Sequence, residues 1–436
     1  MRIIITLILL IFSISPSIAQ KLSRRASWQA SIIWPDNHQP GAVIKRVDNN
    51  SPLEEAGIHA GDRILAVDGR NILDQEDWSA ISYAIRANRE TSIMIKRGNQ
   101  SIVKSVKLKA LDYEKHTGIE TTYGQVVSDY GIAQRTIITS PNVNKKLPAI
   151  FLLSGLSCST VEGYPGRSNK WAKLIIDLVE KSGMVVMRVE KPGVGDSQGD
   201  CGQTDFLTEL NGYEAAIESL KASSLVDTTK IVVFGSSMGS ALAPYFANKY
   251  QLAGVISEGT FYKTWYEHML EIERRILSFK GNNESEVLKK MNQWYIPLYH
   301  GMLINKKSYA DVIKEYPTLK EANYHAPYHM YGRPMDYYHQ LQDFDFAKEW
   351  ESLKAPIRIR RGTNDWIMSE FDNNMIIDVL DRNKHVDHKL YKYPGLDHWS
   401  TIHESALNSF NGKPGKWEDK ISQQVIDWAQ EMAGMN

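Results

Sequence analysis

Two patterns of apolar and polar positions divide the chain near residue 110. Before that point, apolar and polar residues alternate over short stretches at 41–47, 63–67, 92–96 and 101–108. Strict alternation is typical of strands that bury one face, and Asp68-Gly69 is typical of a hairpin turn. Residues 28–110 are therefore predicted to form a small β-rich domain, with a helical turn after Ser51-Pro52 and a helix near residues 75–88.

The pattern changes after a charged linker at residues 110–118. Continuous apolar runs occur at 149–153, 184–189, 231–234, 252–256, 357–360 and 388–392. Segments with helical spacing separate them, for example 171–179 and 206–220. This alternation predicts an α/β domain over residues 119–436, with a doubly wound, mostly parallel sheet covered by helices on both faces. Ligand sites in such sheets lie beyond the carboxyl ends of the strands.

One long interval interrupts this alternation. Residues 261–350 show helical patterns and no clear strand, and 18 of these 90 residues are Phe, Trp or Tyr, against 10% in the whole chain. A small aromatic core would explain this composition. Because the segment is inserted at the carboxyl rim of the sheet, we expect a helical cap that lies over the site.

The first domain contains the sequence SPLEEAGIHAGDRILAVDGRNI at residues 51–72. This run resembles the PDZ domain family, which implies binding of an extended peptide C-terminus by strand addition. The family's glycine-rich carboxylate loop would fall near Trp28–Ile33, where no glycine is present. A structural or substrate-positioning role is therefore an alternative to peptide capture.

The clearest chemical signal is Gly235-Ser236-Ser237-Met238-Gly239, between a buried strand and an apolar helix. Small residues on both sides of Ser237 allow a tight turn that exposes its hydroxyl at a helix N-terminus. A serine needs a base and an orienting acid to become a nucleophile. In the second half of the chain, Asp365 and His398 each follow a predicted strand in the order acid, then histidine.

These residues make positions 119–436 resemble the α/β-hydrolase superfamily. The resemblance implies that Ser237 is the nucleophile, His398 the general base and then acid, and Asp365 the residue that orients the imidazole. Glu258 is an alternative acid and His403 an alternative base, whereas Asp397 is expected to brace the loop or face solvent. The oxyanion hole would use the backbone N–H groups of Leu156 and Met238.

The loop that carries Leu156, Ser154-Gly155-Leu156-Ser157-Cys158, lacks the His-Gly-Gly-Gly form of many lipases. The two cysteines, Cys158 and Cys201, each follow a predicted strand and would lie on one rim of the sheet. They can form one disulfide or remain two buried thiols. Residues 191–199 resemble the superfamily's Gly-x-Gly-x-Ser-x-Gly turn, and their glycine spacing does not fit a dinucleotide site.

The composition of the chain and its first 19 residues exclude some classes of function and favour others. Lys plus Arg and Asp plus Glu are both 51, which gives no general attraction to nucleic acid. An apolar run after Arg2, followed by Ser17-Ile18-Ala19, predicts a signal peptide at residues 1–19 and a periplasmic or extracellular protein without stable membrane insertion. No P-loop and no cysteine or histidine pattern for a metal is present, so no cofactor is expected.

Together these features predict an exported serine hydrolase that acts on a small-molecule or peptide acyl substrate. Esters are the default because alcohols leave more easily than amines. The alternatives are a serine peptidase or amidase, and a noncatalytic protein that binds peptides through its PDZ-like domain. Because no triad residue lies in residues 20–110, their removal is expected to leave the turnover of short esters largely intact.

Overall fold

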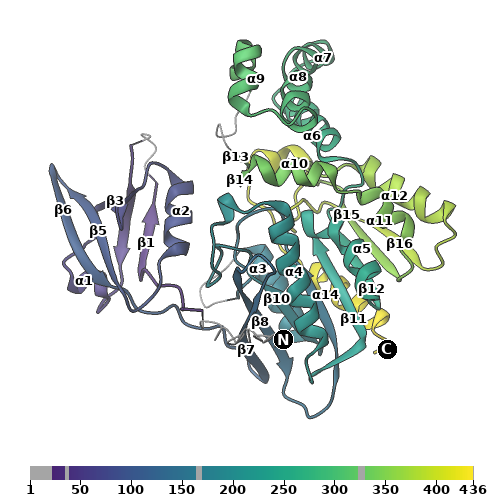
Figure 1. Ribbon diagram of the computed structural model, residues 1–436, viewed down its shortest axis with the longest axis horizontal. Helices are drawn as coiled ribbons and strands as arrows, with labels where there is room; N and C mark the ends of the chain where they lie inside the picture. The colour runs from purple at the N-terminus through teal and green to yellow at the C-terminus, as the bar shows by residue number, and fades with distance from the viewer. Residues whose placement is uncertain (1–21, 35–38, 164–168, 323–328, 436) are drawn as a thin grey trace, which may run out of the picture.

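The computed structural model describes residues 22–34, 39–163, 169–322 and 329–435. The signal peptide predicted at residues 1–19 lies outside them. Figure 1 shows a β-rich domain on one side, a larger α/β domain beside it, and helices stacked above the larger sheet. Within the described ranges, no helix combines the length and the apolar character needed to cross a bilayer.

The first domain is a six-stranded antiparallel sheet with two helices. Its strands are β1 (Ala30–Ile33), β2 (Ala42–Val47), β3 (Arg63–Val67), β4 (Arg70–Asn71), β5 (Glu90–Arg97) and β6 (Gln100–Lys107). The helices α1 (Pro52–Glu55) and α2 (Gln75–Ala84) begin at Ser51 and Asp74, which cap them with their side chains. The strand order β1-β2-β3-β5-β6 leaves β1 at one edge of the sheet.

The second domain is built on an eight-stranded sheet in the order β16-β15-β12-β11-β9-β10-β8-β7. The strands are β7 (Ile119–Val127), β8 (Ala133–Pro141), β9 (Leu147–Leu153), β10 (Val185–Val189), β11 (Val226–Ser236), β12 (Gly254–Glu258), β15 (Ile357–Gly362) and β16 (His388–Tyr393). From β10 to β16 all neighbours are parallel, so their carboxyl ends share one edge. The predicted mostly parallel sheet is confirmed.

Helices cover both faces of this sheet. One face packs against α3 (Lys170–Lys181) and α14 (Lys420–Met432), and the other against α4 (Phe206–Lys221), α5 (Met238–Tyr250) and α12 (Glu370–Arg382). Alternate residues of β9 pack into the hydrophobic cores on the two faces of the sheet. Ile150 and Leu152 pack into the core beneath α3 and α14, and Phe151 and Leu153 into the core beneath α4, α5 and α12. Burial on both faces explains why these strands are continuous apolar runs.

The segment between β12 and β15 forms the cap. It contains α6 (Trp265–Phe279), α7 (Glu284–Lys290), α8 (Ile296–Tyr299), α9 (Tyr309–Glu315) and α10 (Met335–Asp343), whereas α11 (Phe346–Ser352), at the end of the predicted cap segment, packs against α5 and α12 beside the sheet. Two π-helical stretches, Met291–Tyr295 and His300–Ile304, flank α8. The structure also has a short hairpin, β13 (His329–Met330) and β14 (Arg333–Pro334), which the helical pattern did not indicate.

The strands β7 and β8 were not expected as separate elements. They pair antiparallel with each other, and β8 also pairs with β10, which extends the parallel sheet at one edge. Polar residues of β8 are buried, among them Gln134, Arg135, Thr136 and Thr139. The apolar pattern missed this strand because part of its buried surface is polar and hydrogen-bonded.

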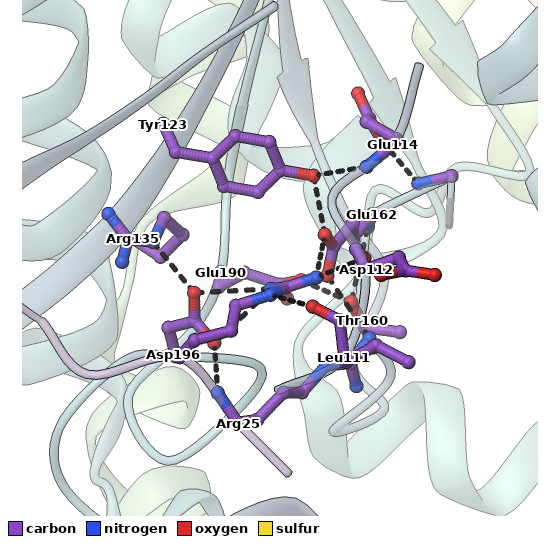
Figure 2. Close-up of polar contacts among 12 residues, drawn as sticks. Arg25, Leu111, Asp112, Glu114, Tyr123, Arg135, Thr160, Glu162, Glu190 and Asp196 are labelled. Carbon is purple, nitrogen blue, oxygen red and sulfur yellow. Dashed lines mark hydrogen bonds and ion pairs between the residues drawn. The ribbon is translucent and has the colours of Figure 1, made fainter. Parts of the chain in front are cut away.

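A buried polar cluster joins the start of the described chain to the α/β domain. Arg24 pairs with Glu162 and with Asp196 at 3.2 Å, and Arg25 also pairs with Glu162, at 3.1 Å. Figure 2 shows these carboxylates with Arg135, which reaches Asp196 at 3.0 Å. Because neighbouring Ala26 belongs to the PDZ-like core, the two domains are connected by buried charges as well as by the linker.

Candidate active site

Ser237 lies at the sharp turn between β11 and α5. Its backbone has φ 55° and ψ −124°, a conformation that non-glycine residues rarely adopt. Glycine is required on both sides: a Cβ at Gly235 would lie 2.2 Å from the Gly239 carbonyl oxygen, and one at Gly239 2.2 Å from that of Leu153. The small residues of the motif therefore allow the strand and helix to approach closely enough to present the serine hydroxyl.

The structure brings Ser237, His398 and Asp365 into one hydrogen-bonded chain. His398 Nε2 lies 2.9 Å from Ser237 Oγ, and His398 Nδ1 lies 3.0 Å from Asp365 Oδ2. The carboxylate accepts the Nδ1 proton, which leaves Nε2 to accept the serine proton. The other oxygen of Asp365 accepts the backbone N–H groups of Ile367 and Met368, both at 2.9 Å, and these bonds fix the carboxylate.

Burial and the neighbouring charge have opposite effects on the pKa of the His398 imidazole. Burial alone would lower the pKa of His398, but the carboxylate of Asp365 outweighs it and raises that pKa above its usual 6.5. Burial likewise opposes ionisation of Asp365, while His398 and Arg361 hold the pKa of this carboxyl below its usual value. The pair is therefore arranged to stabilise an imidazolium when a proton arrives from Ser237.

The alternative acid and base lie elsewhere. Glu258 forms an ion pair with Arg360 at 2.8 Å and accepts a hydrogen bond from Ser400. These contacts connect the end of β12 to β15 and to the loop after β16. His403 pairs with Asp397 at 3.1 Å. Asp397 is buried and accepts the backbone N–H groups of Trp399 and Thr401. Asp397 therefore shapes the loop that presents His398.

Two residues next to Ser237, Leu156 and Met238, have backbone N–H groups with no acceptor in the described part of the chain. Met238 is the first residue of α5, so its N–H has no partner within the helix. The loop after β9 passes close to the serine: a Cβ at Gly155 would lie 3.0 Å from Ser237 Cβ. Leu156 follows directly, and no group in the described part of the chain accepts its N–H. Both residues line the cavity that holds Ser237.

The same loop is covalently tied to its neighbour. Cys158 and Cys201 form a disulfide with a Cα separation of 5.9 Å. This bond connects the loop after β9 to the short 3-10 helix Cys201–Gln203, which precedes α4. Of the two alternatives that the sequence left open, the structure has the bridged one.

The candidate nucleophile, Ser237, lines a cavity of about 800 Å³. Its walls come from the loop after β9, the start of α3, the cap and the loops after β15 and β16, and they include four tryptophans: Trp171, Trp265, Trp366 and Trp399. His268 of α6 also lines it, and burial lowers the pKa of this imidazole to about 3, so it is neutral. The site therefore offers a large, mostly apolar space next to one reactive hydroxyl.

Sequence reasoning missed several residues around the site. The cap was expected over it, but His268 and Trp265 could not be distinguished from the other aromatic residues of the insertion. Lys191 was noticed only as part of a glycine-rich turn, yet it is buried and donates hydrogen bonds to the carbonyls of Gly155 and Leu156 in the loop after β9. Among the described residues, no group of three or more His, Cys, Asp or Glu side chains is placed to hold a metal ion.

The doubly wound sheet, the strained serine turn and the Ser-His-Asp chain define an α/β-hydrolase. Comparison with known families agrees, because the family model described as "Serine aminopeptidase, S33" matches residues 157–405, more than half of the chain. The chain belongs to this family. A PDZ domain model matches residues 32–108. Both resemblances deduced from the sequence are confirmed, and the chain is an α/β-hydrolase with an N-terminal PDZ domain.

Individual proteins match each part separately. Esterase EstD of Thermotoga maritima is 22% identical over 293 residues, covering 67% of this chain and 64% of EstD. Serine protease HTRA1 of Xenopus laevis is 34% identical over 80 residues, covering 18% of this chain and 17% of that protein. Among solved structures, the Pyrococcus furiosus esterase Pf2001 has a TM-score of 0.43 and 13% identity, over 74% of this chain and 97% of that one.

Proposed function

We propose that this protein is an exported serine hydrolase that cleaves carboxylic esters through an acyl-serine intermediate. The observation that carries the proposal is the continuous hydrogen-bonded chain from Asp365 through His398 to Ser237, at the wall of a large cavity. The export part rests on the leader predicted at residues 1–19 and agrees with the disulfide, since such bonds persist in oxidising compartments.

In the first half of the reaction, Ser237 Oγ attacks the ester carbonyl carbon as its proton passes to His398 Nε2. The carbonyl oxygen becomes an oxyanion that accepts hydrogen bonds from the N–H groups of Leu156 and Met238. Collapse of this intermediate breaks the carbon–oxygen bond to the alcohol, which leaves with the proton from Nε2. The acyl group is then bonded to Ser237.

In the second half, a water molecule gives a proton to His398 Nε2 and attacks the acyl carbon. Breaking the bond to Oγ returns the proton to Ser237 and releases the carboxylic acid. The tryptophan walls suit an apolar acyl or alcohol group, because burial of apolar surface favours binding by about 25 cal/mol per Å².

A fluorophosphonate probe and p-nitrophenyl esters test this proposal. We expect labelling of the wild type and none of Ser237→Ala, with Ser236→Ala as the neighbouring control that stays reactive. The kcat/KM should rise from acetate to longer acyl chains until the cavity is filled. Failure of the folded wild type to react with either reagent would refute the enzyme, and preference for aminoacyl anilides would favour the peptidase alternative.

We also propose that the PDZ domain presents an edge for peptide addition. Within the described residues, strand β1 pairs only with β2, which is the arrangement that strand addition requires. Trp28, just before β1, contacts Trp78 of α2, with ring centroids 4.7 Å apart. This contact limits the space for a peptide between β1 and α2. Binding of fluorescent peptides with a free C-terminus, but not of their amides, would support capture; equal binding of both would contradict it.

A further inference from the structure

Lys191 lies just after β10 and is buried behind the loop after β9, residues 154–158, which we call the oxyanion loop. Its side chain is 1% exposed, and its ammonium group donates hydrogen bonds to the carbonyl oxygens of Gly155 and Leu156, the latter at 3.2 Å. A lysine is rarely buried this completely unless its charge is paired. Here the ammonium group donates two of its protons to the carbonyl oxygens of consecutive residues of one loop.

The carbonyl of Gly155 and the N–H of Leu156 belong to the same peptide group. A donor on the carbonyl oxygen fixes the plane of that group and therefore the direction of the N–H. It also draws electron density toward the oxygen, which strengthens the N–H as a donor. Lys191 therefore acts on the Leu156 N–H from the side opposite the substrate.

The charges around Lys191 favour an anion in front of the loop. Glu209 of α4 lies 3.1 Å from the Lys191 ammonium and also pairs with Arg333 of the cap. Two cations and one carboxylate leave one net positive charge in a site closed to water, where electrostatic interactions are strong. Burial lowers the pKa of Lys191 to about 8, so at neutral pH the ammonium form predominates.

The disulfide holds the loop at a second point. Arg333 Nη1 lies 2.7 Å from Cys201 Sγ and 3.6 Å from Cys158 Sγ, so the same cluster contacts both ends of the bridge. Lys191 holds the loop at residues 155 and 156, and the disulfide holds it at residue 158. Between them the loop has little freedom to turn the Leu156 N–H away from Ser237.

We propose that Lys191 is a positioning residue for ester hydrolysis: it holds and polarises the Gly155–Leu156 peptide group so that this group stabilises the oxyanion. This inference rests on the function proposed above. Because the oxyanion exists only after attack on the carbonyl, the contribution should be made in the transition state and not in substrate binding.

The test is Lys191→Met. This change leaves Glu209 paired with Arg333, so it removes the ammonium without leaving a buried charge unpaired. We expect kcat to fall by about 10- to 100-fold, less than or equal to the loss of a direct oxyanion donor, with KM changed by less than about three-fold. Lys191→Arg keeps a charged donor at this position and should recover part of the loss.

A transition-state analogue separates this role from a merely structural one. An aryl trifluoromethyl ketone forms an oxyanion adduct with a serine, whereas the matching unreactive amide only fills the cavity. The Ki of the ketone should rise in Lys191→Met in parallel with the loss of kcat/KM, while the Kd of the amide stays constant. Lys221→Met is the matched control, because that lysine also donates to a backbone carbonyl, of Tyr250, away from the site.

The outcomes are distinct. If the wild type hydrolyses esters and folded Lys191→Met keeps its kcat, the inference about Lys191 is refuted and the proposed function stands. If the variant loses affinity for ketone and amide alike, Lys191 serves only to keep the cavity in shape, which also refutes it. A wild type without ester turnover overturns the proposed function, and this inference with it.

Discussion

At the scale of single residues, the nucleophile is held in a conformation that its neighbours impose. The left-handed backbone of Ser237 is accompanied by two glycines whose missing side chains make room for the turn. Strain of this kind persists only where the surroundings determine it, and it occurs most often at functional sites. The hydroxyl is therefore presented to His398 before any substrate binds.

The pKa of His398 leads to a prediction about pH. The imidazole must be neutral to accept a proton from Ser237, so activity is lost as the pH falls below the pKa of His398. Since Asp365 raises that pKa above 6.5 despite burial, the acid limb of kcat/KM should have its midpoint above 6.5. A pH profile with a p-nitrophenyl ester measures it directly.

Asp365→Asn is the matching control, because it keeps the shape of the side chain and removes its charge. The midpoint of the acid limb should move to lower pH, and kcat should fall by up to about 10⁴-fold, as in other enzymes with this triad. Glu258→Gln should lower the midpoint by less, since Glu258 raises the pKa of His398 less than Asp365 does and also pairs with Arg360. An equal shift in both variants would contradict the assignment of Asp365.

The predicted site residues followed from local sequence, and the missed ones did not. Ser237 stands in a motif whose glycines have a local steric reason, and Asp365 and His398 each follow a strand that the apolar pattern located. Arg24 lies in a polar stretch and carries no such signal, and Lys191, although it follows the apolar run 184–189, has no local feature that distinguishes it from other charged residues after strands. The importance of both comes from burial against residues distant in the chain.

At the scale of elements, the alternation of strands and helices was enough to predict the parallel sheet and the place of the cap. The strands β7 and β8, at one end of the sheet, were harder, because β7 is largely unburied and buried polar side chains interrupt the apolar pattern of β8. Arg135 of β8, for example, is buried and reaches Asp196. A strand that buries ion pairs cannot be recognised by hydrophobic periodicity alone.

The buried cluster at Arg24 leads to a prediction about stability. Arg24→Met leaves Glu162 and Asp196 with fewer partners in a buried site, and breaking a buried pair in this way costs about 3–5 kcal/mol. Urea unfolding monitored by circular dichroism measures the change. Arg46→Met is the control, because its pair with Asp48 is exposed and contributes at most about 1 kcal/mol. Equal effects of both variants would show that the cluster adds no stability.

At the scale of the whole molecule, the two domains are less separable than the sequence suggested. The expectation that removal of residues 20–110 leaves the turnover of short esters largely intact considered only the positions of the triad residues. In the structure, Arg24 and Arg25 neutralise Glu162, and Arg86 donates to the carbonyl of Ser197 at 2.9 Å, in the turn that also contains Lys191. The PDZ domain therefore contacts segments that lead to the oxyanion loop.

We accordingly expect a chain that begins at residue 111 to be destabilised and to lose most of its ester turnover. Removal of Arg24 and Arg25 leaves the carboxylates of Glu162 and Asp196 poorly compensated. Adding Glu162→Gln and Asp196→Asn to the shortened chain should recover soluble protein and probe labelling. Full thermal stability and turnover in the shortened chain without these changes would restore the idea of independent domains.

The buried polar cluster around Arg24 also determines the order in which the two domains can fold and dock, because the chain is made from its N-terminus. Arg24 bonds to Glu162, 138 positions later, and to Asp196, 172 positions later. Contacts this far apart are slow to close. In an exported chain the PDZ sequence leaves the export channel before either carboxylate does, so both arginines stay in water while β1 to β6 can already pair. Docking of the two domains is therefore a late step of folding, and it cannot guide the earlier ones.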